Sequence, residues 1–140
     1  MQSKSQEYSQ KVFENITKLV KEQTDEDGKQ KKPLARYKSL VKRSGGILRS
    51  VGLIQYLTFL AAKAAKTSEI HHEFLLNHLS DELNSLEILP AATNRDELIK
   101  TVQGQDLPQY MRLTQEVLKL LQWHRRISEI LISGTANQEV

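Results

Sequence analysis

The four histidines are the residues best suited to bind a metal ion, and their spacing argues against a shared site. His71 and His78 are seven residues apart and would share one face of a helix. At a rise of ~1.5 Å per residue they lie more than about 10 Å apart, too far to hold one ion. His72 falls in a stripe of leucines and His124 in an apolar helix face, where a lone histidine is usually a hydrogen-bonded core residue. We therefore expect neither a metal site nor a cofactor.

Hydrolytic chemistry has no recognisable signature in this sequence. Acidic residues concentrate in the run 25–27 and at expected helix starts such as Asp96 and Glu97, where the helix dipole favours them. No histidine is paired by spacing with a serine and an aspartate, and none of the seven arginines has a histidine five residues further on, as some helical ribonucleases do. Gly45 and Gly46 lack the surroundings of a phosphate-binding loop. We expect no catalytic residues, and an enzyme is the class of protein that the sequence supports least.

Positive charge is concentrated in one part of the chain. The net charge is only +3, yet the stretch from Gly28 to Ser68 contains no Asp or Glu and ten of the twenty basic residues. The rest of the chain has ten basic against seventeen acidic residues, a balance of −7. Such asymmetry points to a polyanion or an acidic partner. The alternative interpretation is a solvated basic face that binds nothing.

Five of these ten basic residues fall into two columns on one expected helix. Lys38, Lys42 and Arg49 lie in a narrow column beside the apolar face, and Arg36 and Arg43 lie on the opposite margin. Columns of this kind follow nucleic-acid phosphates with little sequence specificity. The candidate nucleic-acid-binding residues, including two lysines of the next helix, are Arg36, Lys38, Lys42, Arg43, Arg49, Lys63 and Lys66.

A third basic stripe lies on the last expected helix. Arg112, Lys119 and Arg126 recur every seven residues, and Trp123 lies beside them, away from the main apolar face. Tryptophan and arginine together on an outer face suit a protein interface or base stacking. We take these four residues as candidates for partner binding. The alternative is that Trp123 packs beneath a neighbouring helix.

The elements that carry these residues all have helical periodicity. Apolar spacing predicts an N-terminal helix at about 5–24, a basic loop at 25–32, core helices within 33–104 and a long C-terminal helix at about 107–133. Gly45 and Gly46 within the second expected helix, with Gly52 near its end, predict a bend or break. Thr67 with Ser68 predicts a helix cap, and Asn94 and Asp106 predict the starts of two later helices. The pattern indicates one all-α domain over 1–140, a compact bundle of about six helices.

Composition also limits the setting in which the protein works. There is no cysteine, and the polar N-terminus from Met1 to Glu7 has no apolar core of the kind found in signal peptides. No run approaches the ~20 apolar residues that a membrane span requires. We therefore expect a cytoplasmic protein that does not enter a membrane.

Two segments together resemble a known family. Residues 110–127 resemble the C-terminal helix of the small, fifth subunit of the Cmr complex in the spacing of six residues. Upstream, the run 37–43 and the Gly52-Leu53 pair with its following apolar residues resemble the central helices of that family. The likeness covers roughly residues 8–132, and this chain has Gly45 and Gly46 where many members have a proline. The positions of the C-terminal helix that carry the likeness are Tyr110, Thr114, Leu118, Leu121, Trp123 and Arg126.

This resemblance implies a role in antiviral defence. The Cmr complex is a type III-B CRISPR–Cas effector that uses a guide RNA to bind and cleave foreign RNA. Its small subunits stack along the guide–target RNA, against the repeating backbone subunit, the large Cas10-type subunit and further copies of themselves. Cleavage belongs to the backbone subunits, so the small subunit is expected to be non-catalytic, to contact RNA phosphates through its basic face, and to be largely monomeric when free.

A second interpretation is a free-standing helical nucleic-acid-binding protein or regulator. Such a protein would present a recognition helix and bind duplex DNA alone. The glycines within the basic helix weaken this interpretation.

Overall fold

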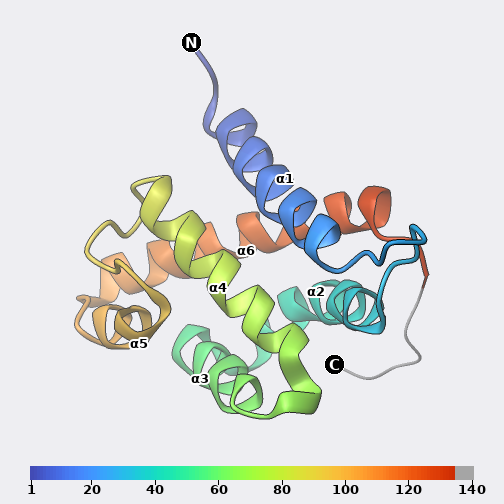
Figure 1. Ribbon diagram of the computed structural model, residues 1–140. Helices are drawn as coiled ribbons and strands as arrows, with labels where there is room; N and C mark the ends of the chain where they lie inside the picture. Colours follow the sequence, from blue (N-terminus) through green and yellow to red (C-terminus); the bar gives the residue numbers. More distant parts are fainter. Residues whose placement is uncertain (135–140) are drawn as a thin grey trace.

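The computed structural model describes residues 1–134, which form helices joined by short connections (Figure 1). In these residues the β-type pairing is limited to an isolated bridge between Thr24 and Gln30. The expected all-α bundle of about six helices is confirmed. In chain order the elements are α1 (Lys4–Glu22), α2 (Lys32–Val51), α3 (Leu53–Ala64), the 3-10 turn η1 (Thr67–Glu69), α4 (Ile70–Ser85), α5 (Arg95–Gln103) and α6 (Leu107–Leu131).

Three helices begin at side-chain caps supplied by the residue just before the helix. Ser3, Asn94 and Asp106 each accept a hydrogen bond from the backbone N–H three residues further on, at 3.2, 3.0 and 3.1 Å. These bonds satisfy N–H groups that the first helical turn leaves without a partner. They open α1, α5 and α6 respectively.

The expected cap at Thr67 and Ser68 is wrong. These two residues form η1, and α4 begins after them at Ile70, without a side-chain hydrogen bond at its cap. The short turn matters for the site described below, because it brings Glu69 against the first two histidines of α4.

Of the glycines expected to bend or break this region, Gly45 and Gly46 do not interrupt α2, which runs through both to Val51. The helix ends instead at Gly52, whose φ of +89° is accessible mainly to glycine. The next helix, α3, has no side-chain cap of its own. Its Ile54 N–H donates a hydrogen bond to the Tyr110 hydroxyl of α6 at 3.1 Å. A residue distant in sequence therefore completes the turn from α2 to α3.

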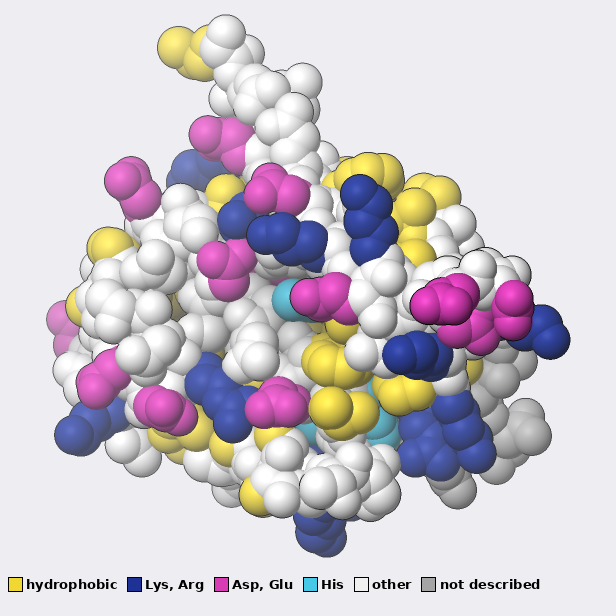
Figure 2. Space-filling model, viewed as in Figure 1, with side chains coloured by type: hydrophobic (Ala, Val, Ile, Leu, Met, Phe, Trp, Pro, Cys, Tyr) yellow, Lys and Arg dark blue, Asp and Glu magenta, His cyan; other side chains and the backbone are white. Residues whose placement is uncertain are grey.

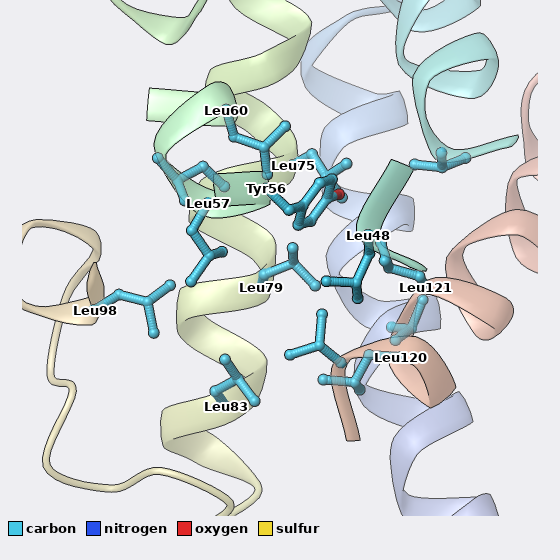
Figure 3. Close-up of a cluster of buried hydrophobic side chains, with 14 of the residues drawn as sticks. Leu48, Tyr56, Leu57, Leu60, Leu75, Leu79, Leu83, Leu98, Leu120 and Leu121 are labelled. Carbon is cyan, nitrogen blue, oxygen red and sulfur yellow. The ribbon is translucent and has the colours of Figure 1, made fainter. Parts of the chain in front are cut away.

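The longest helix, α6, spans the width of the molecule and packs against both α1 and α2 (Figure 1). Helix α4 packs against α2, α3 and α1, and α5 covers α3 and α4. Leucines from α2, α3, α4, α5 and α6 meet around Tyr56 in the interior (Figure 3). Burying these side chains fixes the helices relative to one another, and the relative positions of α1, α2 and α6 define the surfaces considered next.

Candidate nucleic-acid and partner surfaces

A basic groove lies between α2 and α6. Three cations line it: Lys42 and Arg49 from α2, and Arg125 from α6. The hollow measures about 120 Å³, and within the described part of the chain no carboxylate is among its lining residues, which also include Gly45, Gly46, Val41, Leu118, Leu121 and Gln122. A groove with cations on both walls suits the phosphate backbone of a nucleic acid.

The two glycines form the floor of this groove. A Cβ on Gly45 would lie 3.4 Å from the Arg49 Nη1, and a Cβ on Gly46 would meet no described atom within 4 Å. The guanidinium of Arg49 therefore lies over a strip of helix backbone that carries no side chain.

Sequence reasoning placed Lys42 and Arg49 together but missed Arg125. Only the packing of α6 against α2 reveals that Arg125 faces them. The sequence signal for Arg125 was its place next to Arg126. Two adjacent residues on a helix point about 100° apart, so only one of these two arginines could belong to the stripe with Trp123.

Lys38, unlike the other two residues of its column, has polar contacts within the described part of the chain. Its ammonium donates a hydrogen bond to the Ile132 carbonyl at 2.9 Å and lies 3.9 Å from the Glu129 carboxylate. The side chain is only 14% exposed. A cation at the end of a helix satisfies carbonyl groups that lack helical partners, so Lys38 fastens α2 to the end of α6.

The remaining candidates lie elsewhere on the basic segment. Arg43 is exposed on α2, and Lys66 is exposed just after the end of α3. Arg36 and Lys63 are half-buried, and the Arg36 guanidinium donates to the Ser68 carbonyl at 3.1 Å. The structure thus brings Lys42 and Arg49 into one groove, whereas Arg36 lines a separate pocket beside the start of α4.

A larger, mainly apolar groove lies between α1 and α6. It measures about 630 Å³, with Phe13 and Thr17 on the α1 side and Trp123 and Ile127 on the α6 side. Phe13 is 46% exposed. In Figure 2, hydrophobic side chains reach the surface where α1 meets α6, with a basic side chain beside them. Exposed apolar surface rimmed by charge is typical of a protein interface.

Trp123 separates this groove from a second hollow of about 360 Å³, which it lines with Tyr8, Lys119 and Arg126. The indole is half-buried against the core, and the Arg126 guanidinium lies 5.6 Å from its ring centroid. Trp123 thus packs within the chain, as the alternative interpretation expects, and also lines two surface hollows. Its role in partner binding stays a prediction.

The other two partner candidates have contacts within the chain. Lys119 lies 2.9 Å from the Glu116 carboxylate but is 60% exposed. Arg112 donates to the side-chain oxygen of Gln109 at 3.0 Å and, more weakly, to the Ile88 carbonyl at 3.4 Å.

A buried polar network fixes the rotation of α6. The Tyr37 hydroxyl of α2 lies 2.7 Å from His78 Nδ1 and 2.9 Å from His124 Nδ1. His124 Nε2 lies 2.8 Å from both carboxylate oxygens of Glu82, and Asn15 donates to the same carboxylate at 2.9 Å. Tyr37, Glu82 and His124 are completely buried, which raises the pKa of Tyr37 well above its usual value. These groups cannot reach a substrate, so the network is structural, and His124 is the hydrogen-bonded core residue that its position predicts.

A second polar cluster lies at the start of α4. His72 Nδ1 lies 3.1 Å and His71 Nε2 3.8 Å from Glu69 Oε2. Burial, with a contribution from His72, lowers the pKa of His71 to about 4, and burial also lowers the pKa of His72. Both rings are therefore neutral at pH 7. Sequence reasoning compared His71 with His78 and overlooked Glu69, although the Glu-Ile-His-His order was visible.

No helix within residues 1–134 has both the length and the apolar character required to cross a bilayer.

Comparison with known proteins agrees with the likeness found in residues 110–127 and in the central helices. Residues 3–131 match the family described as CRISPR-associated protein (Cas_Cmr5). The CRISPR system Cmr subunit Cmr5 of Thermus thermophilus is 27% identical over 132 residues, which are 94% of this chain and 98% of that protein. The X-ray structure of a CRISPR-associated Cmr5 family protein from Thermus thermophilus matches with a TM-score of 0.70 and 26% identity, over 95% of this chain and 100% of the other. The family match spans nearly the whole chain, and the protein therefore belongs to the Cmr5 family of CRISPR-associated proteins.

Proposed function

We propose that this protein is a non-catalytic small subunit of a Cmr-type RNA-guided effector complex and that it holds RNA by its phosphate backbone in the groove between α2 and α6. The observation that carries the proposal is the convergence of Lys42, Arg49 and Arg125 on a groove whose described lining includes no carboxylate. The Thermus thermophilus relative is itself described as a CRISPR system Cmr subunit.

The groove is suited to backbone recognition rather than to base reading. Its polar side chains are three cations and Gln122, and its floor is glycine backbone. In guide-based systems, base pairing reads the sequence, and the protein grips backbone and shape. A subunit with this groove can therefore serve any guide.

The groove between α1 and α6 is the proposed contact with protein partners in the complex. Trp123 and Phe13 offer aromatic surface there, and Arg126 lies against Trp123 in the adjoining hollow. Tryptophan and arginine are the residues most enriched where protein interfaces concentrate their binding energy. The proposed partners are the backbone subunit, the large Cas10-type subunit and further copies of this chain.

A triple variant tests the RNA-binding surface. We expect Lys42→Ala/Arg49→Ala/Arg125→Ala to assemble into the complex normally and to retain target RNA less well with every guide. If three phosphate contacts are lost, the plot of the logarithm of the binding constant against the logarithm of salt concentration should become less steep. Its negative slope should shrink in magnitude by about 2 for single-stranded RNA. The measurement is filter binding of labelled target RNA by the assembled complex over a range of salt concentrations.

The matched control is Lys29→Ala/Lys31→Ala/Lys100→Ala, which removes the same charge from exposed positions outside the groove. This control should bind RNA nearly as well as wild type. Equal retention by the groove variant and by wild type at low salt would show that RNA does not lie between α2 and α6. Tight RNA binding by the isolated chain would favour a free-standing binding protein instead.

A further inference from the structure

Three potential metal ligands from η1 and α4 converge on one point. They are the carboxylate of Glu69 and the imidazoles of His71 and His72, and one donor atom from each lies within 4.8 Å of the other two. Glu69 Oε2 is 3.1 Å from His72 Nδ1 and 3.8 Å from His71 Nε2. His72 Nδ1 also lies 3.2 Å from the Glu69 carbonyl oxygen, a contact that an ion bound at Nδ1 would replace. Ligands bound tetrahedrally at ~2.1 Å from an ion lie roughly 3.4 Å apart. Two of the three separations are therefore already close to those of a bound site.

The ring nitrogens of His71 are buried and make no hydrogen bond with the described residues. Its side chain is 2% exposed, and neither ring nitrogen has a hydrogen-bond partner within residues 1–134. Buried polar groups in folded proteins nearly always have such partners, because leaving them unsatisfied costs free energy. His124, another deeply buried histidine of the bundle, makes hydrogen bonds through both of its nitrogens. Both ring nitrogens of His71 are therefore available to bind a metal ion.

The surroundings also suit ring nitrogens that bind a metal. The imidazoles of His71 and His72 lie 4.2 Å apart between ring centroids, and Phe59 meets the His72 ring edge-on at 5.4 Å. These ring contacts hold the two imidazoles in place. His71 also lines a pocket of about 230 Å³, which provides a route from solvent.

The charges around the cluster restrict the kind of ion. Arg36 and Lys63 lie close enough to disfavour positive charge on His71, so they oppose any cation and the site can hold only an ion that its few ligands bind strongly. Hard ions such as Mg²⁺ and Ca²⁺ need several oxygen ligands and are poorly served here. Imidazole nitrogens suit Zn²⁺ and related transition-metal ions, which bind strongly to few ligands.

We propose that Glu69, His71 and His72 form a binding site for one Zn²⁺-like divalent ion, with a fourth coordination position open toward the pocket beside α2. This site departs from the expectation that the histidines hold no metal. The bound ion would tie η1 to the first turn of α4 and so stiffen the connection from α3 to α4. The proposal is independent of the RNA-binding groove, which lies on other residues.

Titration of the full chain with Co²⁺ and Zn²⁺ tests the site. After treatment with a chelator, wild type should bind one Co²⁺, develop the visible absorption bands of a four-coordinate ion and lose them when Zn²⁺ is added. Zn²⁺ should also raise the melting temperature of wild type.

Two variants remove ligands in different ways. Glu69→Gln keeps the shape of the side chain, and His71→Leu replaces an unsatisfied imidazole with an apolar group that the core accepts. Both should weaken Zn²⁺ binding, measured by calorimetry, by more than ~10-fold, since changes even to the outer partners of metal sites cost that much. His71→Leu should melt no lower than metal-free wild type.

The control is Glu73→Gln, which removes a carboxylate from the same helix and should leave Zn²⁺ affinity unchanged. The absence of Co²⁺ bands in wild type would overturn the proposal. The proposal would also be overturned if both ligand variants bound Zn²⁺ as tightly as wild type, because the ion would then bind elsewhere on the chain.

Discussion

The imidazole of His124 lies 2.8 Å from each carboxylate oxygen of Glu82, and neither side chain is exposed to solvent. This pair joins α6 to α4 in the centre of the bundle, and Asn15 and Tyr37 extend it to α1 and α2. Because Trp123 and Arg125 flank His124, the pair determines which groove each of them faces.

Replacement of Glu82 should destabilise the protein strongly. Glu82→Leu removes the acceptor for His124 and for Asn15 in a buried site, so we expect a loss of about 3–5 kcal/mol in the free energy of unfolding. Urea denaturation followed by circular dichroism measures the loss. Glu26→Gln, in the exposed loop after α1, is the control and should change stability by less than about 0.5 kcal/mol. A similarly small loss for Glu82→Leu would contradict a structural role for the network.

Acid should weaken the fold through His78. Burial, reinforced by the nearby His124, lowers the pKa of His78 from 6.5 to about 3. The unfolded chain therefore binds a proton, between about pH 6.5 and 3, that the folded chain does not bind. Stability from the neutral ring is complete above pH 6.5 and is lost as the pH falls through that range, by about 1.4 kcal/mol per pH unit.

This pH dependence can be assigned with a single variant. His78→Gln keeps a polar side chain but cannot titrate, so its unfolding free energy should decline less steeply than that of wild type between about pH 6 and 4. Urea unfolding at a series of pH values gives both slopes. Parallel slopes would mean that other groups cause the acid sensitivity.

Lys38 and Lys42 should respond differently to the same substitution. Lys38→Ala removes a nearly buried hydrogen bond to the end of α6, and we expect a loss of about 2 kcal/mol in stability. Lys42→Ala removes an exposed charge and should cost less than about 0.5 kcal/mol. RNA retention by the assembled complex should fall with Lys42→Ala at unchanged stability. Thermal melting together with filter binding separates the two roles, and equal melting temperatures would refute the proposed fastening of α2 to α6.

Filling the floor of the basic groove should separate stability from RNA binding. A Cβ at Gly46 meets no described atom within 4 Å, and glutamine is a better helix former than glycine by several tenths of a kcal/mol. Gly46→Gln should therefore raise the melting temperature slightly while it narrows the groove and reduces RNA retention. Undiminished retention in this variant would argue that RNA does not enter the groove.

Trp123→Ala should weaken incorporation into the complex more than it weakens the fold. The indole is half-buried and lines both hollows beside α1, so its loss removes aromatic contact area from the proposed interface. Co-purification with the other subunits measures incorporation, and circular dichroism checks folding. If a folded variant were incorporated as well as wild type, the partner contact would lie outside this groove. The remaining aromatic surface of Phe13, on the opposite wall, would not change that conclusion.

The sequence predicted the helices well because their signals are local. Apolar periodicity and the caps at Asn94 and Asp106 depend on residues within a turn or two of each other. The expected break occurs at Gly52 and not at Gly45 and Gly46, because tertiary packing on both sides of α2 outweighs the low helix propensity of glycine there. The cap expected at Thr67 was wrong because a 3-10 turn occupies that position.

The surfaces were only partly predictable, since they depend on how helices face each other. Lys42 and Arg49 could be paired on one helix, but Arg125 joins them only when α6 packs on α2 with its observed rotation. Lys38 belonged to the same column, yet its charge is engaged by the end of a helix that begins about seventy residues later in the chain. The cluster around His71 depends on the turn that places Glu69 beside it.

Helix α6 forms one wall of both grooves, with Arg125 facing α2 and Trp123 facing α1. A rotation of α6 about its axis that widened one groove would narrow the other, because all side chains of a helix rotate together. The hydrogen bonds of His124 oppose any such rotation. A partner protein bound at Trp123 and a nucleic acid bound at Arg125 would therefore contact opposite faces of one rigid helix. Neither would need to reorient α6 before the other could bind.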